Sequence, residues 1–191
     1  MMNLYKFYSK PDELLGVKEK KYFPWVAYDQ AEQGKKISAR QLAAIASDPE
    51  YAYYYARYII RDPFPAGEAA IASSPEYAYF YAKDVIRGRF PLGEAAIATD
   101  IDYAYLYAKN VIRGRWPEME KIIASNPFYA YRYARNVIKD RWPQGEAAIA
   151  KNPFYAYHYA RYIIKDRWPQ GEAAIAKNYA REYKEFLDSL R

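Results

Sequence analysis

Three basic side chains return at a fixed spacing along this chain. In one copy they are Lys83, Arg87 and Arg89. Residues four apart in a helix lie on the same face, and guanidinium groups bind phosphate through two parallel hydrogen bonds. Aligned along a stack of helices, such side chains would form a basic ladder able to bind a phosphate backbone or an anionic nucleotide. The other members of this basic ladder are Lys109, Arg113, Arg115, Arg135, Lys139, Arg141, Arg161, Lys165 and Arg167.

A second interpretation of the basic ladder stays open. Lys and Arg near the C-terminal end of a helix interact favourably with the helix dipole, and a repeated sequence copies any charge into every unit. The formal net charge of +6 is modest for 191 residues. The basic ladder is therefore either a surface for anions or a set of solvating charges at helix ends.

A second group of side chains varies where the rest of the repeated sequence is constant. Tyr54, Phe80 and His158 share one position of the repeat, and Phe128 and Phe154 share another. Exposed aromatic and Arg side chains on a constant frame are typical of a surface that binds a partner. Packing against a neighbouring helix is the alternative. The candidate partner surface consists of Tyr54, Phe80, Leu106, Phe128, Arg132, Phe154 and His158.

The residues that enzymes use for catalysis are scarce. The chain has no cysteine and a single histidine, His158, which excludes thiol nucleophiles and sites built from several histidines. Leu106 occupies the position of His158 in an earlier copy, and no carboxylate lies at a fixed helical spacing to orient the imidazole. Gly67 and Gly93 are isolated and form no phosphate-binding loop. We therefore expect no enzymatic activity, no cofactor and no metal site.

The elements that must position these side chains come from one repeated unit. A weak first copy begins at Pro24. The later copies are marked by a glutamate that recurs every 26 residues, at Glu68, Glu94, Glu120, Glu146 and Glu172.

Each copy predicts a short helix followed by a longer one. The short helix begins near Glu68, whose charge suits the first turn of a helix. Ser74 is expected to cap the longer helix, and Pro75 needs no amide partner in the first turn. The longer helix is predicted to end at Gly88, and an aromatic–proline pair marks the loop that follows.

Helical periodicity divides the longer helix into two faces. Tyr77, Ala78, Tyr81 and Ala82 lie on one arc, which we expect to be buried. Small alanines let neighbouring helices approach closely, and tyrosine rings fill the space between copies. The other arc carries the basic ladder and the candidate partner surface.

One such pair of helices cannot bury its own apolar arc, so the copies are expected to stack into an all-α fold, an α-solenoid of two-helix repeats. We expect the repeats over residues 24–178 and an N-terminal cap over residues 1–23. Residues 179–191 are expected to form a charged C-terminal capping helix, because Glu182 and Phe186 replace two alanines of the repeat there.

The segments IASDP and IAKNPFYAY place a short helix before an Asx–Pro pair and a longer helix. In this they resemble HEAT-type helical repeats and the short leucine-rich variant repeats. The segment IKDRWPQGEAAIAKNPFYAY is similar to tandem-repeat proteins of bacteriophages. The resemblance covers residues 42–178. It implies an α-solenoid and a viral origin, and it supplies no catalytic residues.

Three interpretations of function follow from the sequence. The first is a non-enzymatic scaffold that binds another protein, which for a phage protein implies inhibition of a host factor or defence system. The second is nucleic-acid binding through the basic ladder, and the third is capture of a small anionic nucleotide. No stretch has the roughly 20 apolar residues of a membrane helix, and no signal peptide is recognisable. We therefore expect no membrane partner and a cytoplasmic location, in the host cytoplasm if the protein is phage-encoded. The sequence does not fix the oligomeric state.

Overall fold

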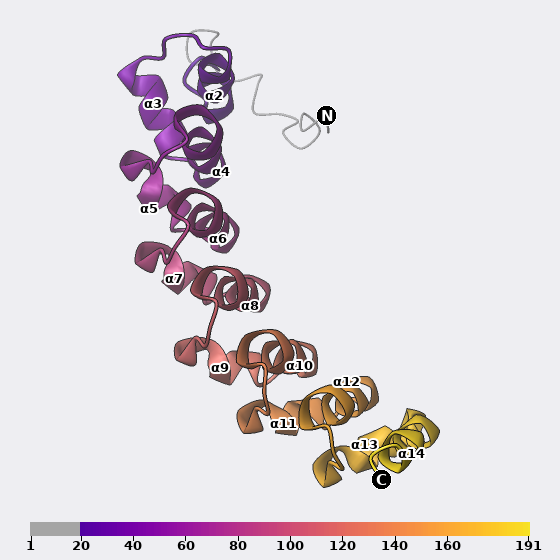
Figure 1. Ribbon diagram of the computed structural model, residues 1–191. Coiled ribbons are helices and arrows are strands. Elements are labelled where there is room, and N and C mark those ends of the chain that lie inside the picture. The colour runs from indigo at the N-terminus through magenta and orange to yellow at the C-terminus, as the bar shows by residue number, and fades with distance from the viewer. Residues whose placement is uncertain (1–19) are drawn as a thin grey trace.

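The computed structural model describes residues 20–191, which form an arc of stacked helices (Figure 1). Every element in this range is a helix, and no strand occurs within it. Long helices line the concave side of the arc, and short helices line its convex side (Figure 1). The predicted all-α solenoid of stacked two-helix repeats is therefore confirmed. None of the described helices is long and apolar enough to cross a membrane.

The centre of the array consists of units of 26 residues, each with a long helix, a connection and a short helix. Consecutive units pack side by side along the arc (Figure 1). We number them repeat 1 (49–74), repeat 2 (75–100), repeat 3 (101–126), repeat 4 (127–152) and repeat 5 (153–178). The predicted N-terminal cap, residues 1–23, lies almost entirely outside the described residues.

Each long helix starts as an α-helix and continues without a break as a π-helical segment. The long helices are α4 (Pro49–Tyr54) with η2 (Tyr55–Ile60), α6 (Pro75–Tyr81) with η4 (Ala82–Ile86), α8 (Ile101–Tyr107) with η5 (Ala108–Ile112), α10 (Pro127–Tyr133) with η6 (Ala134–Ile138), and α12 (Pro153–Tyr159) with η7 (Ala160–Ile164).

The short helices and the two ends complete the array. Before repeat 1 lie α2 (Pro24–Glu32) and α3 (Ala39–Ala46), and after repeat 5 lies α14 (Ala180–Asp188). The short helices are α5 (Glu68–Ile71), which follows the 3-10 turn η3 (Pro65–Gly67), then α7 (Pro91–Ile97), α9 (Pro117–Ile123), α11 (Pro143–Ile149) and α13 (Pro169–Asn178).

The long helices begin where the sequence predicts. The side chain of Ser74 accepts a hydrogen bond from the backbone amide of Tyr77, and Pro75 is the first helical residue. Asp48, Asn126 and Asn152 cap the corresponding helices in the same way. The short helices differ from the prediction, because the proline after each aromatic residue starts the helix of repeats 2–5 instead of marking a loop. Proline suits this first position, where no intrahelical partner exists for an amide.

The ends of the long helices also differ from the prediction. Gly88 was expected to end the helix, but the left-handed residue is the preceding Arg87, with φ 58°. Its backbone amide binds the carbonyl of Ala82 five residues earlier, which is the wider closure of a π-turn. The same conformation recurs in every repeat, with φ between 57° and 60° at Arg61, Arg87, Arg113, Lys139 and Lys165.

The core lies between the two rows of helices. Ala78, Tyr81 and Ala82 are fully buried, as predicted, whereas Tyr77 is only half-buried. The long and short helices approach closely at Ala78, because a Cβ added to Gly93 would lie only 2.7 Å from the Cβ of Ala78. The alanines therefore turn one side of each long helix to the convex row, and residues on its opposite side face the concavity.

Candidate binding surfaces

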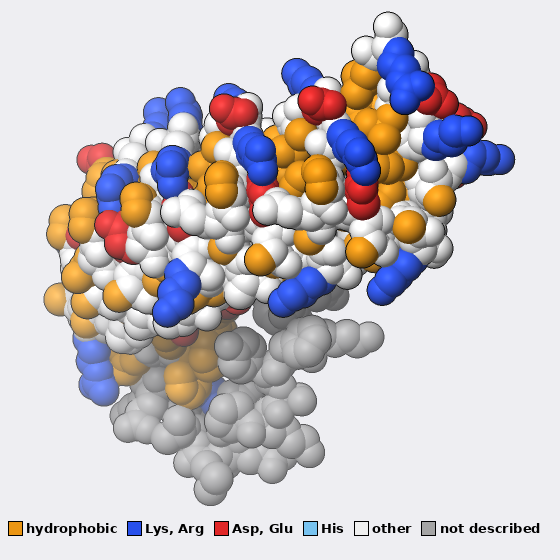
Figure 2. Space-filling model, turned by 90° about the horizontal axis from the view of Figure 1, so that it is seen from below, with side chains coloured by type: hydrophobic (Ala, Val, Ile, Leu, Met, Phe, Trp, Pro, Cys, Tyr) orange, Lys and Arg blue, Asp and Glu red, His pale blue; other side chains and the backbone are white. Residues whose placement is uncertain are grey.

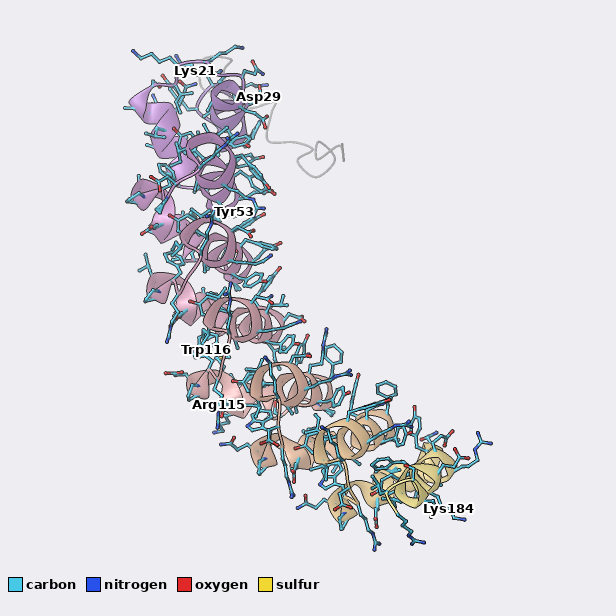
Figure 3. The ribbon with its side chains drawn as sticks, viewed as in Figure 1. Lys21, Asp29, Tyr53, Arg115, Trp116 and Lys184 are labelled. Carbon is cyan, nitrogen blue, oxygen red and sulfur yellow. The ribbon has the colours of Figure 1, made fainter. Side chains whose placement is uncertain are left out.

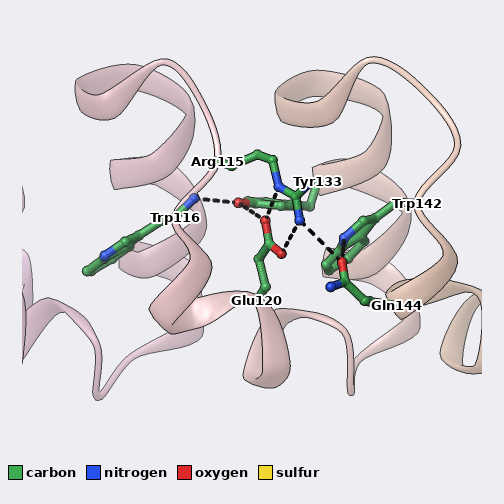
Figure 4. A network of polar contacts seen from close by, with 6 residues as sticks. All are labelled: Arg115, Trp116, Glu120, Tyr133, Trp142 and Gln144. Carbon is green, nitrogen blue, oxygen red and sulfur yellow. Dashed lines mark hydrogen bonds and ion pairs between the residues drawn. The ribbon is translucent and has the colours of Figure 1, made fainter.

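A network of polar contacts joins each repeat to the next (Figure 4). Arg115 donates two hydrogen bonds to the Glu120 carboxylate, 2.7 Å from Nε to Oε1 and 2.6 Å from Nη2 to Oε2. Tyr133 of repeat 4 donates to the same Oε1 at 3.2 Å. Its hydroxyl also accepts a hydrogen bond of 2.7 Å from the backbone amide of Trp116. The connection between η5 and α9, which contains Arg115 and Trp116 (Figure 3), is thereby fixed to the following repeat.

Burial keeps this network in one protonation state. Burial raises the pKa of Tyr107 and of Tyr133 to about 12, so both hydroxyls remain donors to their glutamates at neutral pH. Hydrogen bonds from Arg89 lower the pKa of the Glu94 carboxyl, which stays ionised. The same bidentate pairing joins Arg141 to Glu146 and Arg167 to Glu172.

Four members of the basic ladder are thus bound within the array. Each donates to the glutamate of its own repeat, and the side chains of Arg89, Arg115 and Arg141 are about half exposed, whereas that of Arg167 is 67% exposed. In repeat 1 the position of these arginines is occupied by Pro63, and Glu68 accepts a hydrogen bond from the Tyr81 hydroxyl but has no arginine partner of this kind. The structure therefore separates Arg89, Arg115, Arg141 and Arg167 from the other eight members of the basic ladder.

Positive charge is dispersed over the face of the molecule that Figure 2 shows. Lys and Arg side chains stand singly there, several of them beside an Asp or Glu, and apolar side chains separate them. This face carries no continuous basic stripe.

The remaining members of the basic ladder lie where the long helices end. All long helices run in the same direction, so their C-terminal ends follow one edge of the solenoid. We call this the basic edge. It consists of Arg57, Arg61, Lys83, Arg87, Lys109, Arg113, Arg135, Lys139, Arg161 and Lys165.

The middle of the basic edge is hollowed. A depression of about 960 Å³ spans the helix ends of repeats 2–4, and five cations line it. Within residues 20–191, only Lys83 among them has an ion pair, at 3.7 Å to Asp84. The four cations without one are Arg87, Lys109, Arg113 and Lys139.

A second hollow of about 630 Å³ adjoins the first. It is lined by Arg57 and Arg61 of repeat 1, and it shares Asp84 and Arg87 with the first hollow. Arg57 forms an ion pair with Asp84, so part of the charge is neutralised at this end. The first hollow is therefore more strongly positive on its side formed by repeats 3 and 4 than on its side next to Asp84.

Hydrogen bonds between consecutive long helices hold the floor of the hollow. Asn110 donates to the Tyr79 hydroxyl at 2.7 Å, and Asn136 donates to that of Tyr105 at 2.8 Å. In both pairs the partners are 31 residues apart, which is one repeat plus five residues. Helical periodicity does not reveal these contacts, although a tyrosine and an amide recur at this spacing in the sequence.

The candidate partner surface is mostly half-buried. Phe80 stacks on Tyr53 at 6.0 Å and contacts Tyr103 of the following helix, so its ring packs between repeats. Phe128 makes an edge contact with Tyr155 at 5.9 Å. Phe154 differs, with 46% of its surface exposed. Tyr54, Leu106, Arg132 and His158 are also half-buried.

The positions of the candidate partner surface change character along the concave side. The residue equivalent to Phe154 is a carboxylate in the first three repeats, namely Glu50, Glu76 and Asp102, and Phe128 in repeat 4. Aromatic groups thus replace acidic ones from repeat 4 onward, and the two halves of the concave side offer different chemistry.

His158 lies among aromatic rings and cations. Burial lowers the pKa of its imidazole, and the charges of Arg135 and Arg161 lower it further. Its imidazole contacts Phe154, Tyr162 and other aromatic rings, and no carboxylate orients it in the described range. Within residues 20–191 no group of three or more His, Asp or Glu side chains is placed to hold a metal ion.

Comparison with known proteins gives no further guide to these surfaces. No family model, curated protein or solved structure matches this chain.

Proposed function

We propose that this protein is a non-enzymatic scaffold that binds an acidic surface of another protein along its basic edge. The observation that carries the proposal is the hollow of about 960 Å³, in which four of five lining cations have no ion pair within the described residues. Charges arranged in this way attract and orient an anionic partner.

The backbone of the basic edge supports a role in binding over simple solvation. A residue other than glycine in the left-handed region costs roughly 1–2 kcal/mol, and glycine is the usual residue at such helix ends. A cation at a helix C-terminus gains only about 0.3–1 kcal/mol from the dipole. In repeats 2 and 3 a glycine stands one position later, yet Arg87 and Arg113 occupy the left-handed position. Retaining a long cation there in all five repeats favours a use for its charge.

A protein partner fits this charge distribution better than nucleic acid. Four arginines of the basic ladder are bound to glutamates, and Asp84 lies in both hollows. A phosphate backbone favours an uninterrupted series of cations, since each neutralised phosphate adds to the affinity. For a chain that resembles phage tandem-repeat proteins, we propose a host protein as partner and the host cytoplasm as the place of binding.

Nucleic acid is the second candidate, because the depression in the basic edge spans three repeats. A small anionic nucleotide is less well supported. Small-molecule sites are mostly apolar and enclose their ligand, whereas flexible Lys and Arg side chains line this depression.

The test compares two triple variants in one capture experiment. The first, Arg87→Gln with Arg113→Gln and Lys139→Gln, removes three charges from the depression. The control removes three exposed lysines elsewhere on the array, namely Lys121, Lys151 and Lys177. Bound protein and nucleic acid are both identified from a host lysate.

We expect a protein recovered by the wild type and by the control variant, and lost with the first variant. Equal recovery by all three proteins would contradict the proposal. Recovery of nucleic acid alone, with affinity for oligothymidylate that falls steeply with salt, would establish the second candidate instead.

A further inference from the structure

Three aromatic side chains form a stripe on the long helix of repeat 5. Phe154, His158 and Tyr162 are spaced by four residues, so they follow one another along the side of α12 and η7 opposite the buried alanines. The rings of Phe154 and His158 are 4.2 Å apart, and His158 stacks on Tyr162 at 5.5 Å with an angle of 10°. Phe154 and Tyr162 are each 46% exposed. The stripe therefore presents preorganised aromatic surface to the concavity.

Guanidinium groups lie beside the Tyr162 end of this stripe and beside the neighbouring Phe128 ring. Arg161 and Arg135, the latter from the preceding long helix, each lie 5.6 Å from the centre of the Tyr162 ring. Arg132 lies 4.8 Å from the centre of the Phe128 ring in repeat 4. Aromatic residues and arginines are the residue types that contribute most of the binding energy at protein interfaces.

The long helices of repeats 4 and 5 carry no carboxylate. Residues 127–139 contain three Lys or Arg and residues 153–165 contain two, with no Asp or Glu in either range. By contrast, the long helix of repeat 2 has Glu76 and Asp84 at the positions of Phe154 and Tyr162. The part of the concave side that has no carboxylate on its long helices thus begins at repeat 4, whereas the long helices of repeats 1–3 each carry at least one.

We infer that the concave side of repeats 4 and 5 docks an acidic protein segment that inserts an apolar side chain against Phe154 and Tyr162. This inference rests on the proposed function in its protein-binding form and adds a second contact on the concave side, next to the basic edge. The aromatic stripe contributes apolar area, and the uncompensated arginines pair with carboxylates of the segment. On the concave side an acidic segment is repelled by Glu76 and Asp102, which favours a position at the C-terminal half.

Nucleic acid is a poorer occupant of the same face. A strand that followed the concave side along the array would meet the carboxylates of repeats 2 and 3, and like charges in contact are unfavourable. Base stacking needs free aromatic faces, and His158 and Tyr162 stack on each other.

The repeats supply variants that the fold accepts. Phe154→Glu gives repeat 5 the residue that repeats 1 and 2 have at this position, Glu50 and Glu76. Tyr162→Ala has a matched control in Tyr58→Ala, since Tyr58 occupies the same position in repeat 1, is 52% exposed and also has an arginine near its ring.

The experiment selects from a library of short random peptides with the full-length protein and measures the affinity of the most enriched peptide by fluorescence anisotropy. We expect enriched peptides to combine several Asp or Glu with an aromatic or large aliphatic residue. Phe154→Glu and Tyr162→Ala are expected to weaken binding at least about 30-fold. Tyr58→Ala is expected to leave the affinity within about threefold and all melting temperatures close to the wild type.

Two outcomes would overturn the inference. One is a selection that enriches no acidic peptides, or that enriches only peptides which bind the basic edge and are displaced from it by oligothymidylate. The other is an enriched acidic peptide whose affinity is unchanged by Phe154→Glu and Tyr162→Ala. The proposed function is judged separately. If a lysate partner is lost with the triple variant of the basic edge but retained by Phe154→Glu, the scaffold function stands and this docking site is wrong.

Discussion

Replacing Tyr133 by phenylalanine removes one oxygen atom from the network between repeats 3 and 4. The hydroxyl accepts a hydrogen bond of 2.7 Å from the backbone amide of Trp116 and donates one of 3.2 Å to Glu120. Tyr133 is fully buried, so no water can replace the lost acceptor. A buried amide without a partner costs about 1–3 kcal/mol. Glu120 keeps both hydrogen bonds from Arg115, so we attribute most of the cost to the amide.

The expected loss is therefore about 1–3 kcal/mol of unfolding free energy, measured by urea denaturation followed by far-ultraviolet circular dichroism. A protein of this size loses about 2–4 °C of melting temperature for each kcal/mol. The control is Tyr155→Phe, which removes the hydroxyl of a half-buried ring that also packs between repeats. We expect less than about 0.5 kcal/mol for this control.

The position of Tyr133 adds a second expectation. In a stacked array the stability is a sum of unit terms and nearest-neighbour terms, and this contact joins two units near the middle. Weakening it should broaden the unfolding transition, because the two halves then unfold more independently. If Tyr133→Phe unfolds at the urea concentration and with the steepness of the wild type, the hydroxyl does not join the repeats and our reading of the network is wrong.

Three further changes test other contacts. Gly93→Ala should lower the free energy of unfolding by about 1–3 kcal/mol, since the added Cβ would lie 2.6 Å from a phenylalanine ring and 2.7 Å from an alanine Cβ. Gly114→Ala is the control, because nothing lies within 4 Å of its added Cβ, and it should melt like the wild type. The pKa of Glu94 is lowered in the folded state. The stability that its ionised carboxylate contributes is therefore fully present above the pKa of the unfolded state, and it is lost as the pH falls through the pKa of the folded state. Stability should therefore fall on acidification below about pH 4.5, and less so in Arg89→Gln; an identical acid limb in both proteins would refute this pairing. Arg113→Gly should leave the free energy of unfolding unchanged or raise it by up to about 1 kcal/mol, because glycine adopts the left-handed conformation without strain. The same change should weaken capture of the acidic partner. A large loss of stability would show that the arginine is structural.

The sequence contains most of the fold because the repeat makes each local signal recur. Ser74 and Pro75 predict a helix start that the structure has, and the burial of Ala78 and Ala82 follows from helical periodicity. The helix ends could not be obtained in this way. Propensity favours Gly88 in the left-handed conformation, but the π-helical closure moves that conformation to Arg87, and no local pattern predicts the change.

The candidate surfaces were less predictable for a related reason. Arg115 and Glu120 are five residues apart across a loop, so helical spacing does not reveal their ion pair. Their partner Tyr133 comes from the next repeat, and its contact depends on how the units stack. Sequence periodicity identifies which positions repeat. It does not tell whether a repeated cation meets solvent or a carboxylate, which is why the basic ladder divides into two groups only in three dimensions.

The last network in the array differs from the others in one respect. The backbone amide of Trp168 binds the hydroxyl of Tyr183, which comes from α14 and not from another repeat. Each unit otherwise offers the same acceptor to the unit that precedes it, so the contact is head-to-tail and does not close on itself. Contacts of this kind generate open filaments when both ends are free. By supplying its own tyrosine to the final unit, α14 occupies the place that the long helix of a further repeat would take, and it covers the surface through which the array could be extended head-to-tail.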